Sequence, residues 1–175
     1  NRKIQNELMQ ELEGVRVRNL MVDSQDTLWI ATAGKGIYQV SRDGSFTVYD
    51  ETVNTNGQRF RSLIELDDGT IMASGDSGIT YIKDGKVTGT IGSEDGLDNT
   101  KLLCLMECTD GSVLAGSDGA GIYRIQDGKV TGHYSKEDGL SSGVVMRLVK
   151  SMDDEGVFVV TSNSLSYMDA DGNIR

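Results

Sequence analysis

The sequence has few of the residues from which catalytic and metal centres are usually built. Its 175 residues include two cysteines and one histidine, His133. Cys104 and Cys108 lie four positions apart on one expected strand, roughly 13 Å at about 3.3 Å per residue, which prevents a local disulfide. Because no histidine or further cysteine completes a ligand set, we expect buried thiols, no metal site and no cofactor.

Basic residues are also scarce. The chain has 17 Lys and Arg against 27 Asp and Glu, a net charge of -10. Such a field repels nucleic acid and anionic membrane surfaces, so we expect neither as a partner. No run of about 18 apolar residues is present that could span a membrane. The acidic residues gather in Asp-Gly turns, where aspartate supports a tight reversal without a bound calcium ion.

One unit recurs four times along the chain. Its anchor is a small residue followed by an aliphatic one, and successive anchors lie 42, 43 and 43 residues apart, at Gly36-Ile37, Gly78-Ile79, Gly121-Ile122 and Ser164-Leu165. Each unit predicts four short antiparallel strands separated by glycine turns. A period of about 40 to 45 residues with four strands is typical of a β-propeller blade, so we expect an all-β fold. Helical repeats of similar period do not fit, because glycines interrupt every helical run after about residue 14.

The period divides the chain into a leader and four blades. We predict blades at 14–56, 57–97, 98–140 and 141–175, the last of them incomplete because its outermost strand has only begun. In the leader, residues 1–13, the spacing of Ile4, Leu8 and Leu12 favours a short amphipathic helix, with the end of a preceding blade as the alternative. The incomplete copy and the start at Asn1 lead us to expect a fragment of a larger propeller.

The best-preserved hairpin is the stretch 23–38, which contains the only tryptophan, Trp29. At a β position between two aliphatic residues, Trp29 is expected in the core between blades rather than at a ligand platform. His133 is expected at the surface of an outer strand, because its spacing suggests no acid partner for a catalytic base. The polar connection 50–56 is a candidate ligand or partner loop.

The run Leu28-Trp29-Ile30-Ala31-Thr32 with the following Gly36-Ile37-Tyr38, and the Glu-Asp-Gly-Leu phrases at 94–97 and 137–140, resemble the two-component regulator propeller repeats. These repeats form periplasmic or extracellular sensor regions of bacterial hybrid histidine kinases and related signalling proteins. The resemblance covers nearly all of residues 14–175. It implies an extracytoplasmic segment of a membrane-anchored protein that senses a glycan or another small molecule. It transfers no binding residues, because the repeat motif is structural.

Arginines recur on the expected inner strands. Aligning the copies on Gly14, Gly57, Thr100 and Gly143 brings four residues to one blade position, namely Arg18, Arg61, Cys104 and Arg147. Arg16 and Arg59 lie two residues earlier, on the same strand face. Because first strands line the channel of a propeller, we predict that the arginines form a site for carboxylate, sulfate or uronate groups. The predicted ligand-binding residues are Arg16, Arg18, Arg59, Arg61 and Arg147. The alternative is that they pair with turn aspartates between blades.

These features favour a non-catalytic sensor that binds a small anionic molecule or a glycan. The alternatives are a propeller enzyme of the lyase or glycosidase type and a protein interaction scaffold. An enzyme would need a converging acid and base, which His133 and the scattered turn acids do not suggest. Four blades can close into a small ring, remain open, or pair with a second copy into eight blades. An open array exposes two apolar faces, so we expect a homodimer or larger assembly.

Overall fold

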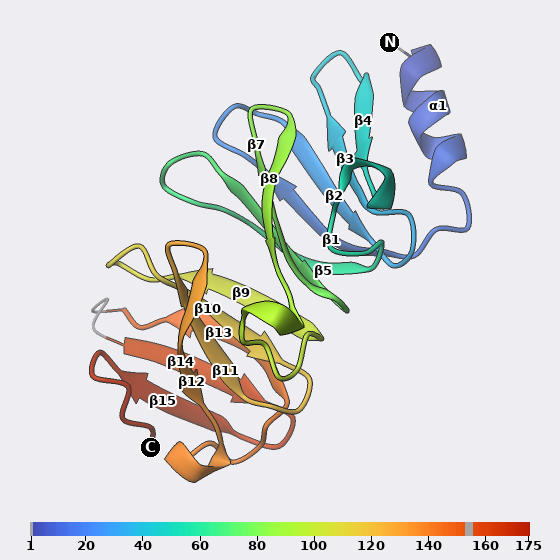
Figure 1. The fold of residues 1–175 in the computed structure, drawn as a ribbon. Helices are drawn as coiled ribbons and strands as arrows, with labels where there is room; N and C mark the ends of the chain where they lie inside the picture. Colours follow the sequence, from blue (N-terminus) through green and yellow to red (C-terminus); the bar gives the residue numbers. More distant parts are fainter. Residues whose placement is uncertain (1, 153–155) are drawn as a thin grey trace.

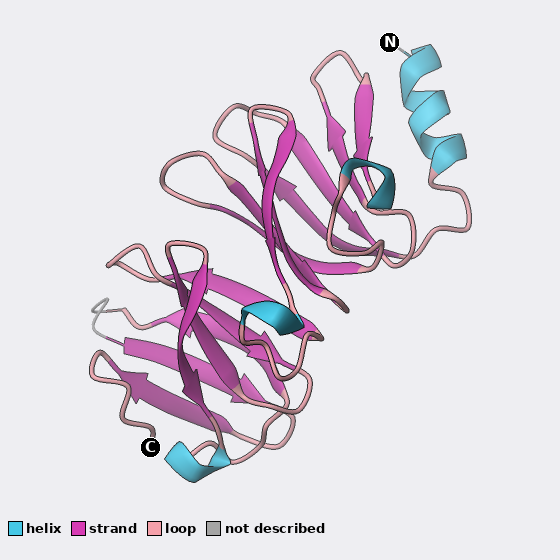
Figure 2. Ribbon diagram, viewed as in Figure 1, coloured by secondary structure: helices cyan, strands magenta, loops and turns pink. Residues whose placement is uncertain are grey.

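The computed structural model describes residues 2–152 and 156–175, with side chains from residue 7 onward. It contains four antiparallel sheets that follow one another along the chain (Figures 1 and 2). The first two sheets comprise β1 (Val17–Val22), β2 (Leu28–Thr32), β3 (Ile37–Val40), β4 (Phe46–Tyr49), β5 (Phe60–Glu65), β6 (Ile71–Gly75), β7 (Gly78–Lys83) and β8 (Lys86–Ile91). The other two comprise β9 (Leu102–Glu107), β10 (Val113–Ser117), β11 (Ile122–Gln126), β12 (Lys129–Tyr134), β13 (Val145–Lys150), β14 (Gly156–Thr161) and β15 (Leu165–Asp169).

The predicted propeller-blade architecture is confirmed. Strands are paired in sequence order within every sheet, and the first strands β1, β5, β9 and β13 contact one another in succession. The sheets therefore fan out from a shared inner edge, and Figure 1 shows them as an open arc with the β1 and β13 sheets at opposite ends. The last sheet has three strands, but Arg175 exchanges backbone hydrogen bonds of 2.7 and 2.9 Å with Tyr167 of β15. A fourth strand begins there.

The core lies between adjacent sheets rather than inside any one of them. Between the first two sheets, Trp29 and Ile37 of one pack with Phe60 and Leu63 of the other. Similar clusters join the second sheet to the third and the third to the fourth. Trp29 is only 3% exposed, which confirms its predicted packing role. Burying a large apolar side chain in this way contributes roughly 1.5–3 kcal/mol.

Two of the Asp-Gly turns, which join the third strand of a sheet to the fourth, have the hairpin geometry that the sequence predicts. Asp84 and Gly85 join β7 to β8 with φ values of 49° and 73°, and Asp127 and Gly128 join β11 to β12 with 51° and 72°. Two successive residues with positive φ make the type I′ turn, whose twist matches that of the strands it connects. Three short 3-10 helices connect one sheet to the next, at Glu51–Val53 (η1), Ser93–Asp95 (η2) and Lys136–Asp138 (η3).

The leader forms a helix, α1 (Arg2–Glu11), that lies on the free face of the first sheet (Figure 1). Leu8 and Leu12 pack against this face, and the Glu11 carboxylate accepts hydrogen bonds from the Tyr38 hydroxyl (3.0 Å) and the Lys35 Nζ (3.1 Å). The predicted helix is confirmed, although the side chain of Ile4 lies outside the described residues. No helix in the described ranges is long and apolar enough to cross a membrane.

Glycine at the repeat anchor is required by a close approach of backbone. Gly36, Gly78 and Gly121 have positive φ, and a Cβ at any of them would lie 2.1 Å from the carbonyl oxygen that ends the fourth strand. That overlap is far inside van der Waals contact. A side chain there would push the fourth strand away. Glycine at the anchor therefore allows the end of the fourth strand to lie against the start of the third.

We expect Gly121→Ala to lower the free energy of unfolding by about 2–4 kcal/mol. About 1–2 kcal/mol comes from positive φ, and the remainder comes from overlap with the carbonyl oxygen of Tyr134. Gly128→Ala is the matched control, because Gly128 also has positive φ but a Cβ added there would have no atom within 4 Å. Urea denaturation measures both variants. Equal losses would show that backbone conformation alone demands glycine at the anchor.

A candidate anion site at the inner strands

Four of the five predicted arginines meet where the first two inner strands begin. Arg16 and Arg18 lie at the start of β1, and Arg59 and Arg61 lie at the start of β5. A backbone bridge pairs Ala33, which follows β2, with Arg59, and the Ala33 N–H donates to the Arg16 carbonyl at 2.9 Å. Backbone pairing thus joins the two sheets next to the four arginine side chains.

Only one carboxylate contacts this group by an ion pair in the described part of the chain. The Nε of Arg61 donates to Oδ1 of Asp76 at 2.8 Å, and both side chains are mostly buried. The Nε of Arg18, by contrast, is buried and has no hydrogen-bond partner among the described residues. Burial lowers the pKa of the Arg18 guanidinium, and the positive charges of Arg16 and Arg61 lower it further. The arrangement leaves Arg18 with an unmet hydrogen-bonding and electrostatic demand.

The imbalance has a local cause in the repeat. In every sheet, the residue that follows the second strand donates its N–H to the carbonyl just before the first strand. That residue is Ala33, Asp76, Asp118 or Ser162 in the four copies. Asp76 pairs with Arg61, and Asp118 pairs with Lys101, so in the second and third sheets this residue neutralises one cation of its own copy. Ala33 has no charge, and the arginines of the first sheet therefore lack an acid from their own copy.

A polar hollow of about 290 Å³ opens beside the cluster. Its walls come from the turn after β2, from the start of η1 and from the segment before β5, with Gly34, Glu51, Gly57, Gln58, Arg59 and Ser77 as lining residues. Glu51 accepts a hydrogen bond from Gln58 Nε2 at 3.2 Å, so part of its charge is engaged. The connection 50–56, a candidate loop from the sequence, borders this hollow through Glu51.

Arg147 is not part of the cluster. In the structure, Arg147 pairs with Val160 and shares its blade position with Asn19 and Ser62, which pair with Ala31 and Ser74. The sequence alignment that placed Arg147 level with Arg18 is therefore wrong by one residue. The charges that act on Arg18 are those of Arg16, Arg59, Arg61 and Asp76, whereas Arg147 acts on the thiol of Cys104.

The displaced register originates in the turn after β6. The Ala31–Ile37 pair of the first sheet encloses five residues, 32–36, whereas its counterpart in the second sheet, Ser74–Ile79, encloses only four, 75–78. Every inner strand after this deletion is shifted by one residue relative to an alignment that keeps a constant period. The residues that take the place of Arg18 and Arg61 in the third and fourth sheets are Leu103 and Met146, which lie at the strand irregularities.

The remaining candidates contribute no reactive group. Both cysteines are free, and burial raises the pKa of the Cys104 thiol to about 11. His133 is exposed on β12, where its ring stacks on Tyr123 at 4.6 Å and its Nε2 lies 2.6 Å from the Ala120 carbonyl oxygen. Within the described residues, no group of three or more His, Cys, Asp and Glu side chains is arranged to hold a metal ion.

Comparisons with known proteins support the fold. No family model and no curated protein matches the sequence. Among solved structures, the extracellular domain of the hybrid two component system BT4673 from B. thetaiotaomicron superposes with a TM-score of 0.74 at 20% identity, covering 91% of this chain and 24% of that one. Virginiamycin B lyase from Staphylococcus aureus has a TM-score of 0.76 at 16% identity, covering 91% of this chain and 54% of that one.

A second hybrid two component system from B. thetaiotaomicron, BT3049, has an extracellular domain that superposes with a TM-score of 0.69 at 17% identity. The superposition covers 91% of this chain and 21% of that domain. The chain thus spans about a fifth to a quarter of these extracellular domains and about half of the lyase. The resemblance predicted from the Leu-Trp-Ile-Ala-Thr repeat is matched by these neighbours, and the superpositions show a shared fold.

We expect Arg18→Met and Arg61→Met to change stability in opposite directions. Arg18→Met removes a partly exposed guanidinium whose buried Nε has no partner among the described residues, and it should raise the free energy of unfolding by about 0.5–1 kcal/mol. Arg61→Met leaves Asp76 without its partner and should lower it by about 1 kcal/mol, a value reduced because both groups retain some solvent contact. Urea denaturation at low salt measures the pair. Destabilisation of both variants would show that the Arg18 side chain stabilises the packing of the sheets, and it would contradict a guanidinium that lacks a partner in the folded chain.

Proposed function

We propose that this chain is the ligand-binding region of a bacterial sensor propeller and that it binds a small anionic molecule or an acidic glycan at Arg16, Arg18, Arg59 and Arg61. The observation that carries the proposal is the buried Arg18 Nε with no partner among the described residues. A carboxylate, sulfate or uronate group would supply the missing acceptor and offset the mutual repulsion of the guanidiniums.

The charge distribution and the adjacent hollow also favour an anionic ligand at the arginine cluster. The chain as a whole has a net charge of -10, so a group of four guanidiniums beside one paired carboxylate is a local exception to the prevailing field. The polar hollow that Arg59 lines gives a ligand a route to the cluster. Since arginine presents a planar fork of donors, it suits the planar carboxylate of a uronate better than a point charge would.

Sensing outside the cytoplasm follows from the same proposal. Two of the similar structures are extracellular domains of hybrid two component systems, and the sequence motif resembles the repeats of such sensors. We propose an extracytoplasmic location in a membrane-anchored signalling protein, with the output function supplied elsewhere in that protein. Fold likeness alone does not fix function, so the proposal depends on the arginine cluster.

A propeller enzyme is the second candidate, because one similar structure is a catalytically inactive histidine-to-alanine variant of virginiamycin B lyase with quinupristin. In this chain the histidine, His133, lies on the outermost strand of its sheet and contacts a backbone carbonyl. It belongs to the third sheet, whereas the arginines lie on the inner strands of the first two sheets. A binding function therefore fits the geometry better than an enzymatic one. Assays on uronate-containing glycans would detect turnover if the chain is an enzyme.

Self-association forms a separate part of the proposal. On the free face of the fourth sheet, Phe158 is 36% exposed and Leu165 is 64% exposed. Their counterparts in the first sheet by pairing register, Trp29 and Ile37, are 3% and 0% exposed because the second sheet covers them. The free face of the fourth sheet thus carries an interblade pattern without a blade upon it.

The opposite end of the arc offers a matching surface. Leu20 of β1 is 62% exposed, whereas its counterpart in the second sheet, Leu63, is 5% exposed beneath the first sheet. Helix α1 covers the outer strands of that face and leaves β1 open. We propose that the fourth sheet of one copy packs on β1 of another, which reproduces the interblade contact and leads to a homodimer or larger assembly.

Galacturonate should stabilise the protein against heat, whereas galactose should not. At ten times its Kd, a ligand that binds only the folded state adds about 1.4 kcal/mol, which raises Tm by about 3–6 °C for a chain of this length. Differential scanning calorimetry at constant ionic strength measures the shift. Arg16→Gln combined with Arg18→Gln should abolish it, and Arg147→Gln, outside the cluster, should retain it. An equal response to galactose, or to galacturonate in the double variant, would contradict the anion site.

Replacing Phe158 and Leu165 together with aspartate should convert the assembly to monomers, because two charges would have to be buried in the contact. Multi-angle light scattering across a concentration series measures the change. Val53→Asp is the control, since Val53 is an exposed apolar residue on η1, between the first two sheets rather than on either free face. A wild-type chain that is strictly monomeric would contradict the proposed contact.

A further inference from the structure

At two of the three junctions between sheets, a glutamate at the end of the inner strand accepts a hydrogen bond from the preceding sheet. Glu65 ends β5 and accepts hydrogen bonds from the Ser24 N–H (2.7 Å) and hydroxyl (2.6 Å). Glu107 ends β9 and lies 3.4 Å from the Asp67 N–H. Ser24 and Asp67 occupy the same place, in the turn that follows the first strand of the preceding sheet. The contact is therefore a property of the repeat.

The third junction breaks this rule. The residue that ends β13 is Lys150, which pairs with Val157 as Glu65 pairs with Ile71 and Glu107 with Val113. An ammonium group cannot accept a hydrogen bond. Thr109 takes the place of Ser24 and Asp67, and no acceptor for its N–H is present in the part of the chain that the structure describes. A donor and a cation therefore stand where the other junctions have a matched donor and acceptor.

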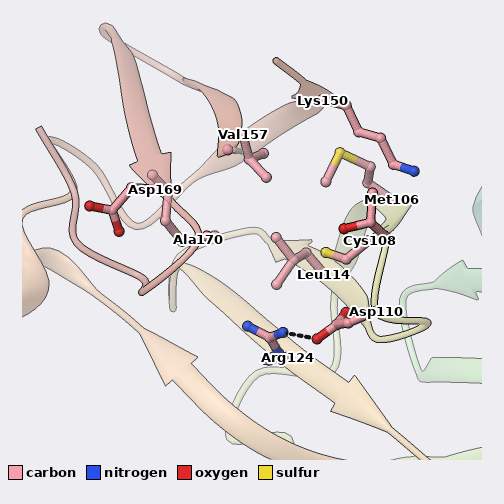
Figure 3. A pocket seen from close by; sticks show the side chains of 12 residues that line it. Met106, Cys108, Asp110, Leu114, Arg124, Lys150, Val157, Asp169 and Ala170 are labelled. Atoms are coloured by element: carbon pink, nitrogen blue, oxygen red, sulfur yellow. Dashed lines mark hydrogen bonds and ion pairs between the residues drawn. The ribbon is translucent and has the colours of Figure 1, made fainter. Parts of the chain in front are cut away.

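A cavity of about 170 Å³ lies at this junction (Figure 3). Its apolar wall comes from the facing surfaces of the third and fourth sheets, and Figure 3 shows the side chains of Leu114 and Val157 directed into the hollow between them. Cavities of about 150 Å³ accommodate a benzene ring. The apolar lining residues are Met106, Leu114, Val157 and Met168, and Cys108, Thr109 and Lys150 lie on the same rim.

The other charges around the cavity are already engaged. Arg124 forms an ion pair with Asp110, drawn as the dashed line in Figure 3. Asp169 accepts hydrogen bonds from the side-chain amide of Asn173 at 3.0 and 3.2 Å. Lys150 forms no ion pair with any described residue. Of the two cations that line the cavity, Arg124 and Lys150, Lys150 is consequently the one that can pair with an anionic ligand.

The hollow at the neighbouring junction provides a comparison within the molecule. It lies between the second and third sheets and is lined by Asp67, Asp68, Glu107 and Asp127, with Tyr81 and Ile125 among its other residues. Because its rim is acidic and Glu107 already occupies the acceptor position, it would repel an anion. The exchange of glutamate for lysine thus changes the character of one junction only.

We propose that the cavity between the third and fourth sheets binds a small carboxylate with an apolar body. The carboxylate takes the place of the missing glutamate, accepts the Thr109 N–H and pairs with the Lys150 ammonium, while the apolar body lies between Leu114 and Val157. The site is independent of the arginine cluster, because it lies at the opposite end of the inner strands. Experiments can therefore contradict the proposal for one site without contradicting the proposal for the other.

Benzoate is a suitable probe, with benzyl alcohol as its neutral counterpart. In ¹⁵N-HSQC titrations benzoate should shift the amides of Thr109, Leu114 and Val157 more than those of Arg18 and Arg61, and benzyl alcohol should bind at least tenfold more weakly. Lys150→Glu installs the residue type of the other junctions and should weaken benzoate binding at least tenfold. Lys150→Arg should keep Kd within about threefold. Lys86→Glu is the matched charge control, at an exposed lysine outside the cavity.

A second variant tests the apolar part of the site without altering its charge. Ala170 is exposed at the edge of the cavity, so Ala170→Phe should fill the entrance and abolish benzoate binding while leaving the core intact. Equal binding of benzyl alcohol, unchanged affinity in Lys150→Glu, or shifts confined to the arginine cluster would each overturn the proposal. Loss of binding in both Lys150→Glu and Ala170→Phe, with binding retained in Lys86→Glu, would support it.

Discussion

The packing of each sheet on the next is the interaction on which this molecule depends. A four-stranded sheet has two faces, and here the buried aromatic and aliphatic side chains lie between sheets, where Trp29 meets Phe60 and Tyr123 lies near Leu97. Stability is therefore shared between neighbours, as in other repeat proteins. The free face of the fourth sheet and the partly covered face of the first follow from the same constraint, and helix α1 reduces that exposure at one end only.

Much of the architecture could be predicted because turn chemistry and period are local properties of the chain. Asp127-Gly128 demands two residues with positive φ, and the recurring Gly36 and Gly121 demand close backbone contact. These requirements leave a visible mark in the sequence. The burial of Trp29 could be predicted for the same reason, since a large aromatic residue between aliphatic neighbours on a strand has few other places to go.

The candidate site was less predictable because it depends on register and on what is missing nearby. A single deleted residue in the turn after β6 moved Arg147 out of line with Arg18, and no feature of β13 itself signals that shift. The isolation of Arg18 depends on Ala33, an ordinary residue whose effect appears only beside Asp76 and Asp118. Comparing turn lengths between copies before aligning inner strands would have found the first of these.

The copies of a repeat act as internal controls for one another, and this gives their differences physical meaning. A position that holds aspartate or glutamate in two copies shows what the backbone geometry requires there, namely an acceptor for a defined N–H or a counterion for a defined cation. Where the acid is replaced by Ala33 or Lys150, the geometry persists but its partner is absent. The buried Arg18 Nε costs stability unless a group from outside accepts its hydrogen bond, whereas the exposed Thr109 and Lys150 are open to a ligand without such a cost. Both candidate sites arise from this principle, one through a lost counterion and the other through a reversed charge.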